Sequence, residues 1–175
     1  MKSKSSQETQ KIAFGLAGIL EENVNFKKAR VVLLKGNLGA GKTTFVIGFL
    51  KYFGIKPSGA SPTFVIMKRY GASLKFKVKN SKLEKEAKRK VSVKEKQKLK
   101  KELRVENIYH LDAYRLKSKE DLKDLDFDRI MSDPKNIVLI EWPEMIKGKK
   151  MKDAMVVEID YGEKENEREI KIIKT

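Results

Sequence analysis

The segment from Gly36 to Thr43 constrains the fold of this chain more than any other part of it. Its sequence, GNLGAGKT, matches the pattern G-x-x-x-x-G-K-[ST] in full. Glycines let the backbone wind so that successive N–H groups point at one phosphate group, and a following helix N-terminus adds positive potential. The pattern predicts a phosphate-binding loop (P-loop), in which Lys42 reaches the β- and γ-phosphates of a nucleotide and the Thr43 hydroxyl binds Mg²⁺.

The residues on both sides of this loop favour the strand and the helix that a P-loop joins. Val31–Leu34 is a short apolar, β-branched run, typical of a buried strand. The stretch Lys42–Phe53 is predicted to be a helix, because a glycine follows it in the usual stop position. Two further apolar runs, Ile108–Leu111 and Asn136–Ile140, predict more buried strands. We therefore expect an α/β fold, a P-loop NTPase-like domain with a central mixed sheet flanked by helices.

Apolar patterns elsewhere in the chain predict the remaining elements. A helix is expected to begin at Ser5–Ser6 and run to about Asn23, with apolar residues at helical spacing. The other expected elements are a helix near Ser118–Leu125, a short helix at Pro143 and a hairpin of two strands, Val156–Ile159 and Glu169–Ile173. Because 175 residues are usual for one domain, we assign residues 1–175 to a single P-loop domain.

The composition excludes several kinds of site. The chain has no cysteine and a single histidine, His110. Disulfides, cysteine-based zinc or iron–sulfur sites and multi-histidine metal sites are therefore excluded. No apolar run approaches the roughly 18 residues that a membrane-spanning helix needs. Since the lack of cysteine also fits a reducing compartment, we expect a cytoplasmic protein with no membrane partner.

The positive charge of the chain is concentrated in one Lys-rich segment. The whole chain has a formal net charge of +16, and residues 74–104 alone contain 14 Lys and Arg against 4 Asp and Glu. We interpret residues 73–104 as an insertion in the domain, an extended hairpin or helical arm. Clustered Lys and Arg are the electrostatic footprint of nucleic-acid binding. A charged segment that is merely solvated is the alternative.

Two acidic residues are candidates to complete the metal site, which needs an acid at the end of a neighbouring strand. Glu141 and Asp112 each follow a predicted buried strand, at the edge where open α/β sheets bind ligands. We favour Glu141 as the metal ligand because its strand is the more apolar. Asp112 would then orient or activate the attacking water, or contact Mg²⁺ through water. His110 shares a strand face with Asp112 and is expected to be a packed, hydrogen-bonded residue.

Four motifs together resemble those of the TsaE (YjeE) family of small bacterial P-loop ATPases. In chain order they are the P-loop, Ser61-Pro62-Thr63-Phe64, His110-x-Asp112-x-Tyr114-Arg115-Leu116 and Glu141-Trp142-Pro143-Glu144. The resemblance covers nearly the whole chain except the Lys-rich segment. Each motif other than the P-loop is weak alone, but the four in this order indicate the family strongly.

The resemblance implies a set of site residues. The nucleotide would contact Gly36, Asn37, Leu38, Gly39, Ala40, Gly41, Lys42, Thr43 and Thr44. Thr43 and Glu141 would bind Mg²⁺, and Asp112, Lys42 and Glu141 would be catalytic. Trp142 would lie near the nucleotide, and Ser61–Phe64 would be a switch-like segment near the γ-phosphate. Thr9 resembles an N-terminal family residue beside the base, and Arg168 resembles a late family arginine near the nucleotide.

The resemblance also implies a function. The family acts in making threonylcarbamoyladenosine (t6A) at position 37 of tRNAs. By resemblance, this chain would bind and hydrolyse ATP with Mg²⁺ to support the TsaD–TsaB pair, with weak activity alone, and its segment 74–104 would contact tRNA. Two alternatives stay open: a nucleotide or small-molecule kinase, with Asp112 accepting a substrate hydroxyl proton, and an RNA-binding module that acts through the basic segment.

Overall fold

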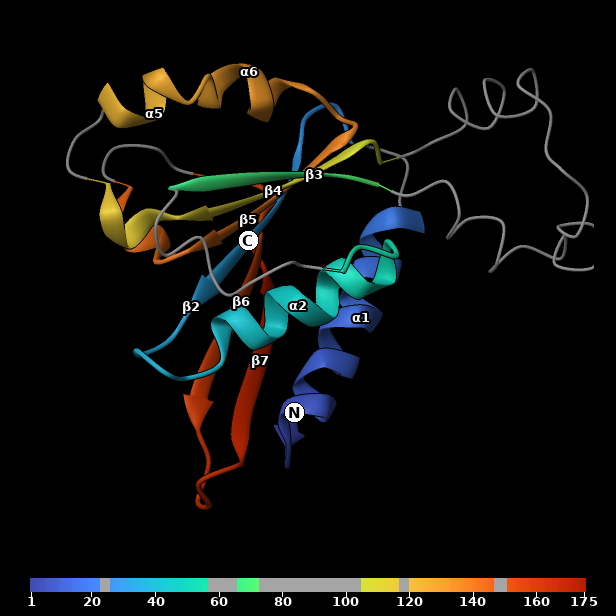
Figure 1. The fold of residues 1–175 in the computed structure, drawn as a ribbon, viewed down its shortest axis with the longest axis vertical. Coiled ribbons are helices and arrows are strands. Elements are labelled where there is room, and N and C mark those ends of the chain that lie inside the picture. Colours follow the sequence, from blue (N-terminus) through green and yellow to red (C-terminus); the bar gives the residue numbers. More distant parts are fainter. Residues whose placement is uncertain (23–25, 57–65, 73–104, 117–119, 147–150) are drawn as a thin grey trace, which may run out of the picture.

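A mixed sheet forms the centre of the molecule (Figure 1). A computed structural model describes residues 1–22, 26–56, 66–72, 105–116, 120–146 and 151–175. The strands described are β1 (Lys2–Ser3), β2 (Arg30–Lys35), β3 (Met67–Gly71), β4 (Asn107–Asp112), β5 (Asn136–Glu141), β6 (Met155–Tyr161) and β7 (Arg168–Lys174). The helices described are α1 (Ser6–Glu22), α2 (Lys42–Tyr52), α5 (Glu120–Asp124) and α6 (Phe127–Ser132), with the short 3-10 helices η2 (Ala113–Arg115) and η3 (Pro143–Met145).

The strand order places the strand before the P-loop in the middle of the sheet. The order is β1-β7-β6-β2-β5-β4-β3. Strands β6, β2, β5 and β4 run parallel, whereas β7, β1 and β3 are antiparallel to their neighbours. All six residues of β5 are buried, as expected for a parallel strand covered on both faces. The carboxyl ends of β2, β4 and β5 meet at one edge of the sheet, where ligands of such folds bind.

Alternate residues of β5 pack against two different helix layers. Ile137 and Leu139 belong to the apolar core that contains α1 and α2, whereas Val138 and Ile140 belong to the core that contains α5 and α6. Figure 1 shows these helix pairs on opposite sides of the sheet. Because successive strand side chains point to opposite faces, Glu141 follows Ile137 and Leu139 onto the side of α2.

The predicted α/β fold, with a mixed sheet and flanking helices, is confirmed. Five predicted strands are found as β2, β4, β5, β6 and β7; they were predicted at Val31–Leu34, Ile108–Leu111, Asn136–Ile140, Val156–Ile159 and Glu169–Ile173. The last two pair antiparallel as a hairpin. The sequence did not predict β1, which pairs with β7, β3, which pairs with β4, or α6, which follows α5. The Lys-rich insertion and Ser61–Phe64 lie outside the described residues, and the single-domain assignment stays a prediction.

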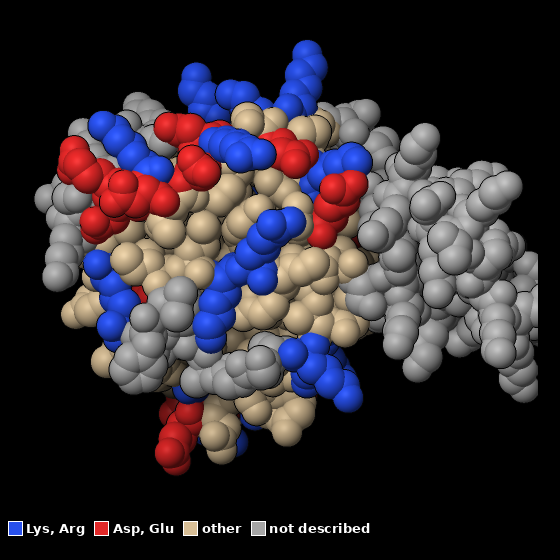
Figure 2. All heavy atoms as spheres, turned by 45° about the horizontal axis from the view of Figure 1, so that its top comes forward, with Lys and Arg blue, Asp and Glu red and all other residues tan. Residues whose placement is uncertain are grey.

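Charged side chains of both signs lie interspersed on the face of the molecule that Figure 2 displays. Blue Lys and Arg side chains are separated there by acidic and uncharged residues, so this face presents no continuous basic surface among the residues it colours. Within the described ranges, no helix combines the length and the apolar character needed to cross a bilayer.

Candidate nucleotide site

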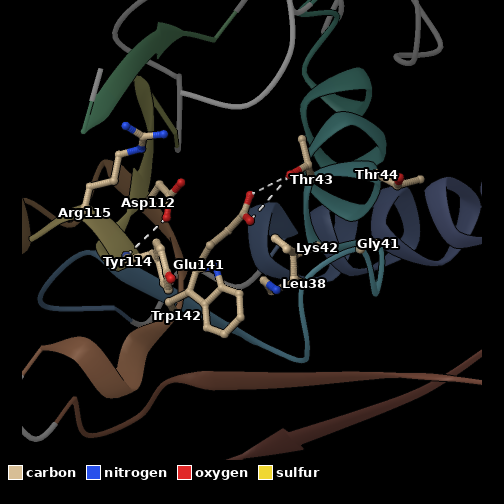
Figure 3. A pocket seen from close by; sticks show the side chains of 11 residues that line it. Leu38, Gly41, Lys42, Thr43, Thr44, Asp112, Tyr114, Arg115, Glu141 and Trp142 are labelled. Carbon is tan, nitrogen blue, oxygen red and sulfur yellow. Dashed lines mark hydrogen bonds between the residues drawn. The ribbon is translucent and has the colours of Figure 1, made fainter. Parts of the chain in front are cut away.

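The P-loop joins β2 to α2 and borders a cavity at the carboxyl edge of the sheet (Figure 3). The cavity has a volume of about 500 Å³, which lies within the range of about 300–1,000 Å³ for small-molecule sites. Its lining residues are Leu38, Gly39, Gly41, Lys42, Thr43, Thr44, Asp112, Tyr114, Arg115, Glu141 and Trp142. The structure therefore brings the P-loop, the end of β4 and the end of β5 around one cavity.

Glycine is required at the start of the P-loop, where the chain leaves β2 and passes β6. Gly36 has a φ of 142°, a region that glycine adopts far more readily than other residues. A Cβ at this position would lie 2.2 Å from the carbonyl oxygen of Ile159 in β6. Any larger residue would push the loop off the strand. Helix α2 begins at Lys42, within the P-loop motif, and its first residues line the cavity.

The amine of Lys42 is held by the loop itself. Its Nζ donates hydrogen bonds to the carbonyl oxygens of Gly36, at 2.6 Å, and Asn37, at 2.9 Å. It also lies 3.8 Å from the centre of the Trp142 ring. Burial lowers the pKa of Lys42, and nearby carboxylates, Glu141 first among them, partly offset this effect. A phosphate beside this amine would supply the opposite charge that favours its protonated form.

Glu141 connects α2 to β4 through two hydrogen bonds. The Thr43 hydroxyl donates to its Oε1 at 3.2 Å, as the dashed lines in Figure 3 show. On the other side, Nε2 of His110 donates to the same oxygen at 2.8 Å, and both side chains are buried. The prediction that His110 is a packed, hydrogen-bonded residue is therefore confirmed, and its partner is the favoured metal-ligand candidate.

Asp112 lies beside Glu141 at the end of the neighbouring strand. The two residues are paired in register between β4 and β5, and both line the cavity. The Asp112 Oδ1 accepts a hydrogen bond from the backbone N–H of Tyr114 at 3.2 Å, which caps η2. The rings of Tyr114 and Trp142 lie 5.3 Å apart, and both residues line the cavity beside Asp112.

Some predicted nucleotide-binding residues do not line the cavity. They are Gly36, Asn37, Ala40, Thr9 and Arg168. Thr9 is buried in α1, where its hydroxyl lies 2.8 Å from Oγ of Ser3, so the structure does not bring it to the site. The Arg168 guanidinium contacts the P-loop from behind, donating from Nε to the carbonyl oxygen of Ala40 at 2.9 Å.

One residue that contacts the P-loop was missed in the sequence. The hydroxyl of Tyr161, at the end of β6, donates a hydrogen bond to the carbonyl oxygen of Leu38. No motif contains Tyr161. It also lies beyond the predicted strand Val156–Ile159, so no local pattern indicated this contact.

Comparison with known proteins identifies the family. A family model described as "Threonylcarbamoyl adenosine biosynthesis protein TsaE" matches residues 3–83 and 92–170. The chain belongs to the TsaE family. The match includes the P-loop and the ends of β4 and β5 that surround the cavity. The family resemblance inferred from the four motifs is thus confirmed.

Curated relatives of this TsaE-family chain carry the name "tRNA threonylcarbamoyladenosine biosynthesis protein TsaE". The protein from Rickettsia conorii is 37% identical over 144 residues, which cover 82% of this chain and 60% of the relative. The protein from Rickettsia felis is 34% identical over 144 residues, covering 82% of this chain and 61% of the relative. The chain therefore spans about three fifths of the length of these relatives.

A solved structure supports the fold. The crystal structure of YdiB from Bacillus subtilis matches with a TM-score of 0.61 and 24% sequence identity. The match covers 100% of this chain and 83% of YdiB. The arrangement of sheet and helices is thus shared with an experimentally determined protein.

Proposed function

We propose that this TsaE-family chain is an ATPase that binds ATP with Mg²⁺ in the cavity and supports a TsaD–TsaB pair in forming t6A at position 37 of tRNA. The observation that carries the proposal is the contact between Thr43 and Glu141, 3.2 Å from oxygen to oxygen, beside the P-loop lysine. P-loop NTPases use this combination of a lysine, a hydroxyl and an acid to hold phosphates and a metal ion.

In this proposal Lys42 binds the β- and γ-phosphates. Its amine already points along the loop, held by the carbonyl oxygens of Gly36 and Asn37. Exchange of these two neutral acceptors for phosphate oxygens pairs the charged amine with a charged acceptor. Since burial lowers the pKa of Lys42, the anionic substrate also stabilises the charge of this amine.

The residues present fit a magnesium ion. Thr43 and Glu141 offer a hydroxyl and a carboxylate, the hard oxygen ligands that Mg²⁺ prefers. Among the described residues there is no group of three or more His, Cys, Asp or Glu side chains able to hold a metal. Mg²⁺ suits so sparse a set because it usually keeps several waters and takes other ligands from substrate phosphates. When bound, it neutralises charge on the transferred phosphoryl group. His110 keeps the Glu141 carboxylate turned toward Thr43.

Asp112 is proposed to orient or activate the attacking water. It lines the same cavity as Thr43 and Glu141 and comes from the adjacent strand. Its carboxylate is fixed in direction by the N–H of Tyr114. A carboxylate held at this edge can accept a proton from water or from a substrate hydroxyl, which is why a kinase is the alternative that an assay must test.

The partners are proposed from the family. The relatives' name places those proteins in t6A biosynthesis, and the TsaD–TsaB pair follows from the family resemblance. The net charge of +10 in residues 74–104 supports contact with the tRNA backbone, since Lys and Arg that neutralise phosphates release counterions.

The test measures phosphate release from ATP by the whole chain, alone and with TsaD, TsaB and tRNA. We expect slow, Mg²⁺-dependent release alone, faster release with the partners, and loss of both in Lys42→Ala. Lys171→Gln is the matched control, because Lys171 is exposed on β7 away from the cavity. No hydrolysis under either condition would overturn the proposal, and transfer of the phosphoryl group to an added metabolite would favour the kinase.

The tRNA contact has a separate test. Deleting residues 74–104 should weaken tRNA binding and flatten its dependence on salt, because each phosphate contact contributes about 0.9 to the slope of log K against log salt. Equal affinity of the deleted and whole chains across a salt series would exclude the contact and leave a solvated segment. Retained tRNA binding without ATP hydrolysis in the whole chain would favour the RNA-binding module.

A further inference from the structure

The β6–β7 hairpin contacts the back of the P-loop through two side chains that are cross-strand partners. Tyr161 and Arg168 are paired in register. The Tyr161 hydroxyl donates to the carbonyl oxygen of Leu38. Arg168 donates from Nε to the carbonyl oxygen of Ala40 at 2.9 Å and from Nη2 toward that of Gly39 at 3.5 Å. Three successive carbonyl groups of the loop thus point at the hairpin.

The hairpin fixes the arginine that makes these contacts. Nη1 of Arg168 donates to the backbone oxygens of Glu165 and Glu167, each at 2.7 Å. Its guanidinium also lies 5.0 Å from the centre of the Tyr161 ring. The guanidinium is planar, and its Nη1 is bound to the hairpin backbone. Its Nε and Nη2 are therefore held toward the loop in one orientation.

Holding these carbonyl groups determines where the loop N–H groups point. In a planar trans peptide, the C=O of one residue and the N–H of the next point in opposite directions. With the oxygens of Leu38 and Ala40 turned to the hairpin, the N–H groups of Gly39 and Gly41 turn away from it. Gly39 and Gly41 line the cavity. Ala40 does not line it, and its N–H bonds to the carbonyl oxygen of Asn37 within the loop.

We propose that Tyr161 and Arg168 are positioning residues that aim the P-loop N–H groups of Gly39 and Gly41 at the phosphates of the nucleotide. The inference rests on the proposed nucleotide site and deepens it. Arg168 acts through the loop, because it does not line the cavity and its guanidinium is bonded to backbone oxygens of the loop and the hairpin. The role therefore differs from that of an arginine that contacts the γ-phosphate.

The test compares the affinities of ADP and ATP, by calorimetry, in Tyr161→Phe, Arg168→Gln and the control Lys171→Gln. The control removes a positive charge from the same strand without touching the loop. Loss of one or two hydrogen bonds predicts ADP and ATP binding weakened equally, about threefold to tenfold in Tyr161→Phe and about tenfold or more in Arg168→Gln. Lys171→Gln should bind as the unmodified chain does. Thermal unfolding of each variant shows whether it is folded.

Three results would overturn the inference. Unchanged affinities in both variants would show that the loop keeps its shape without the hairpin contacts. A loss confined to ATP would instead place Arg168 on the γ-phosphate. If the unmodified chain binds neither nucleotide, the proposed function fails, and amide hydrogen exchange of Gly39 and Gly41 still tests the positioning. We expect faster exchange in Tyr161→Phe and Arg168→Gln than in the control, and equal rates would refute it.

Discussion

Replacing Gly36 with alanine tests how tightly the P-loop is fixed to the sheet. The alanine would have to adopt a φ of 142°, at a cost of about 1–3 kcal/mol for a strained backbone. Its Cβ would also lie 2.2 Å from the carbonyl oxygen of Ile159, a backbone atom of β6 that cannot rotate away. Overpacking of this kind adds about 1–3 kcal/mol. Together the two effects lower the free energy of unfolding by about 4 kcal/mol.

Thermal unfolding followed by circular dichroism measures this loss. For a chain of this length, 1 kcal/mol corresponds to roughly 2–4 °C in Tm, so Gly36→Ala should lower Tm by about 8–16 °C. Gly15→Ala is the matched control, because Gly15 is exposed in α1 with nothing within 4 Å of its would-be Cβ. It should stabilise the helix by about 0.5–1 kcal/mol. If Gly36→Ala unfolds within about 2 °C of the unmodified chain, the loop is not fixed as described.

Four further variants separate the roles of the site residues. Lys42→Ala should weaken ATP binding by about 100-fold, since two charge-assisted hydrogen bonds are lost, as calorimetry would measure. Glu141→Gln should lower Mg²⁺-dependent phosphate release by about 100-fold with a far smaller change in ADP affinity. Asp112→Ala should keep nucleotide affinity while turnover falls by about 100-fold, as expected for loss of a general base or water-orienting group. His110→Phe should cost about 1–3 kcal/mol in urea unfolding, because the buried Glu141 loses a donor, and should weaken Mg²⁺ binding.

Each of these roles has a result that would remove it. Normal turnover in Asp112→Ala would exclude Asp112 from catalysis. Parallel losses of Mg²⁺ dependence and nucleotide affinity in Glu141→Gln would mean that Glu141 supports the loop instead of the metal. Unchanged stability and metal affinity in His110→Phe would show that the contact between His110 and Glu141 supports neither the fold nor the metal site. Tight ATP binding by Lys42→Ala would contradict the P-loop assignment.

Most of the fold follows from local patterns in the sequence. Residues Ile137–Ile140 of β5 are an unbroken apolar run, and α2 begins at Lys42, within the P-loop motif, so both were predicted with bounds close to those observed. Two of the elements that were missed, β1 and α6, are too short to carry a pattern of their own. Strand β1 has two residues and exists through its pairing with β7, in which Met1 and Ile170 exchange backbone hydrogen bonds. Helix α6 has six residues, fewer than two helical turns.

The site was partly predictable for a related reason. Thr43 belongs to a motif, and Glu141 and Asp112 end apolar strands, so motif and strand position together predicted residues that the fold brings to one cavity. The contact of His110 with Glu141 depends on the register between β4 and β5, which no local pattern specifies. The contacts of Tyr161 and Arg168 with the P-loop join residues more than 120 positions apart. Such contacts require the sheet order and are therefore visible only in the structure.

The most direct test of the account is a crystal structure of the chain with Mg²⁺ and a non-hydrolysable ATP analogue. We predict that the triphosphate lies in the cavity beside the P-loop, and that the metal ion is bound by the Thr43 hydroxyl and lies on the side of Glu141. We also predict that Lys42 Nζ leaves the carbonyl oxygens of Gly36 and Asn37 for the phosphates. A nucleotide bound elsewhere, or Lys42 still bonded to those two oxygens beside a bound nucleotide, would contradict these predictions.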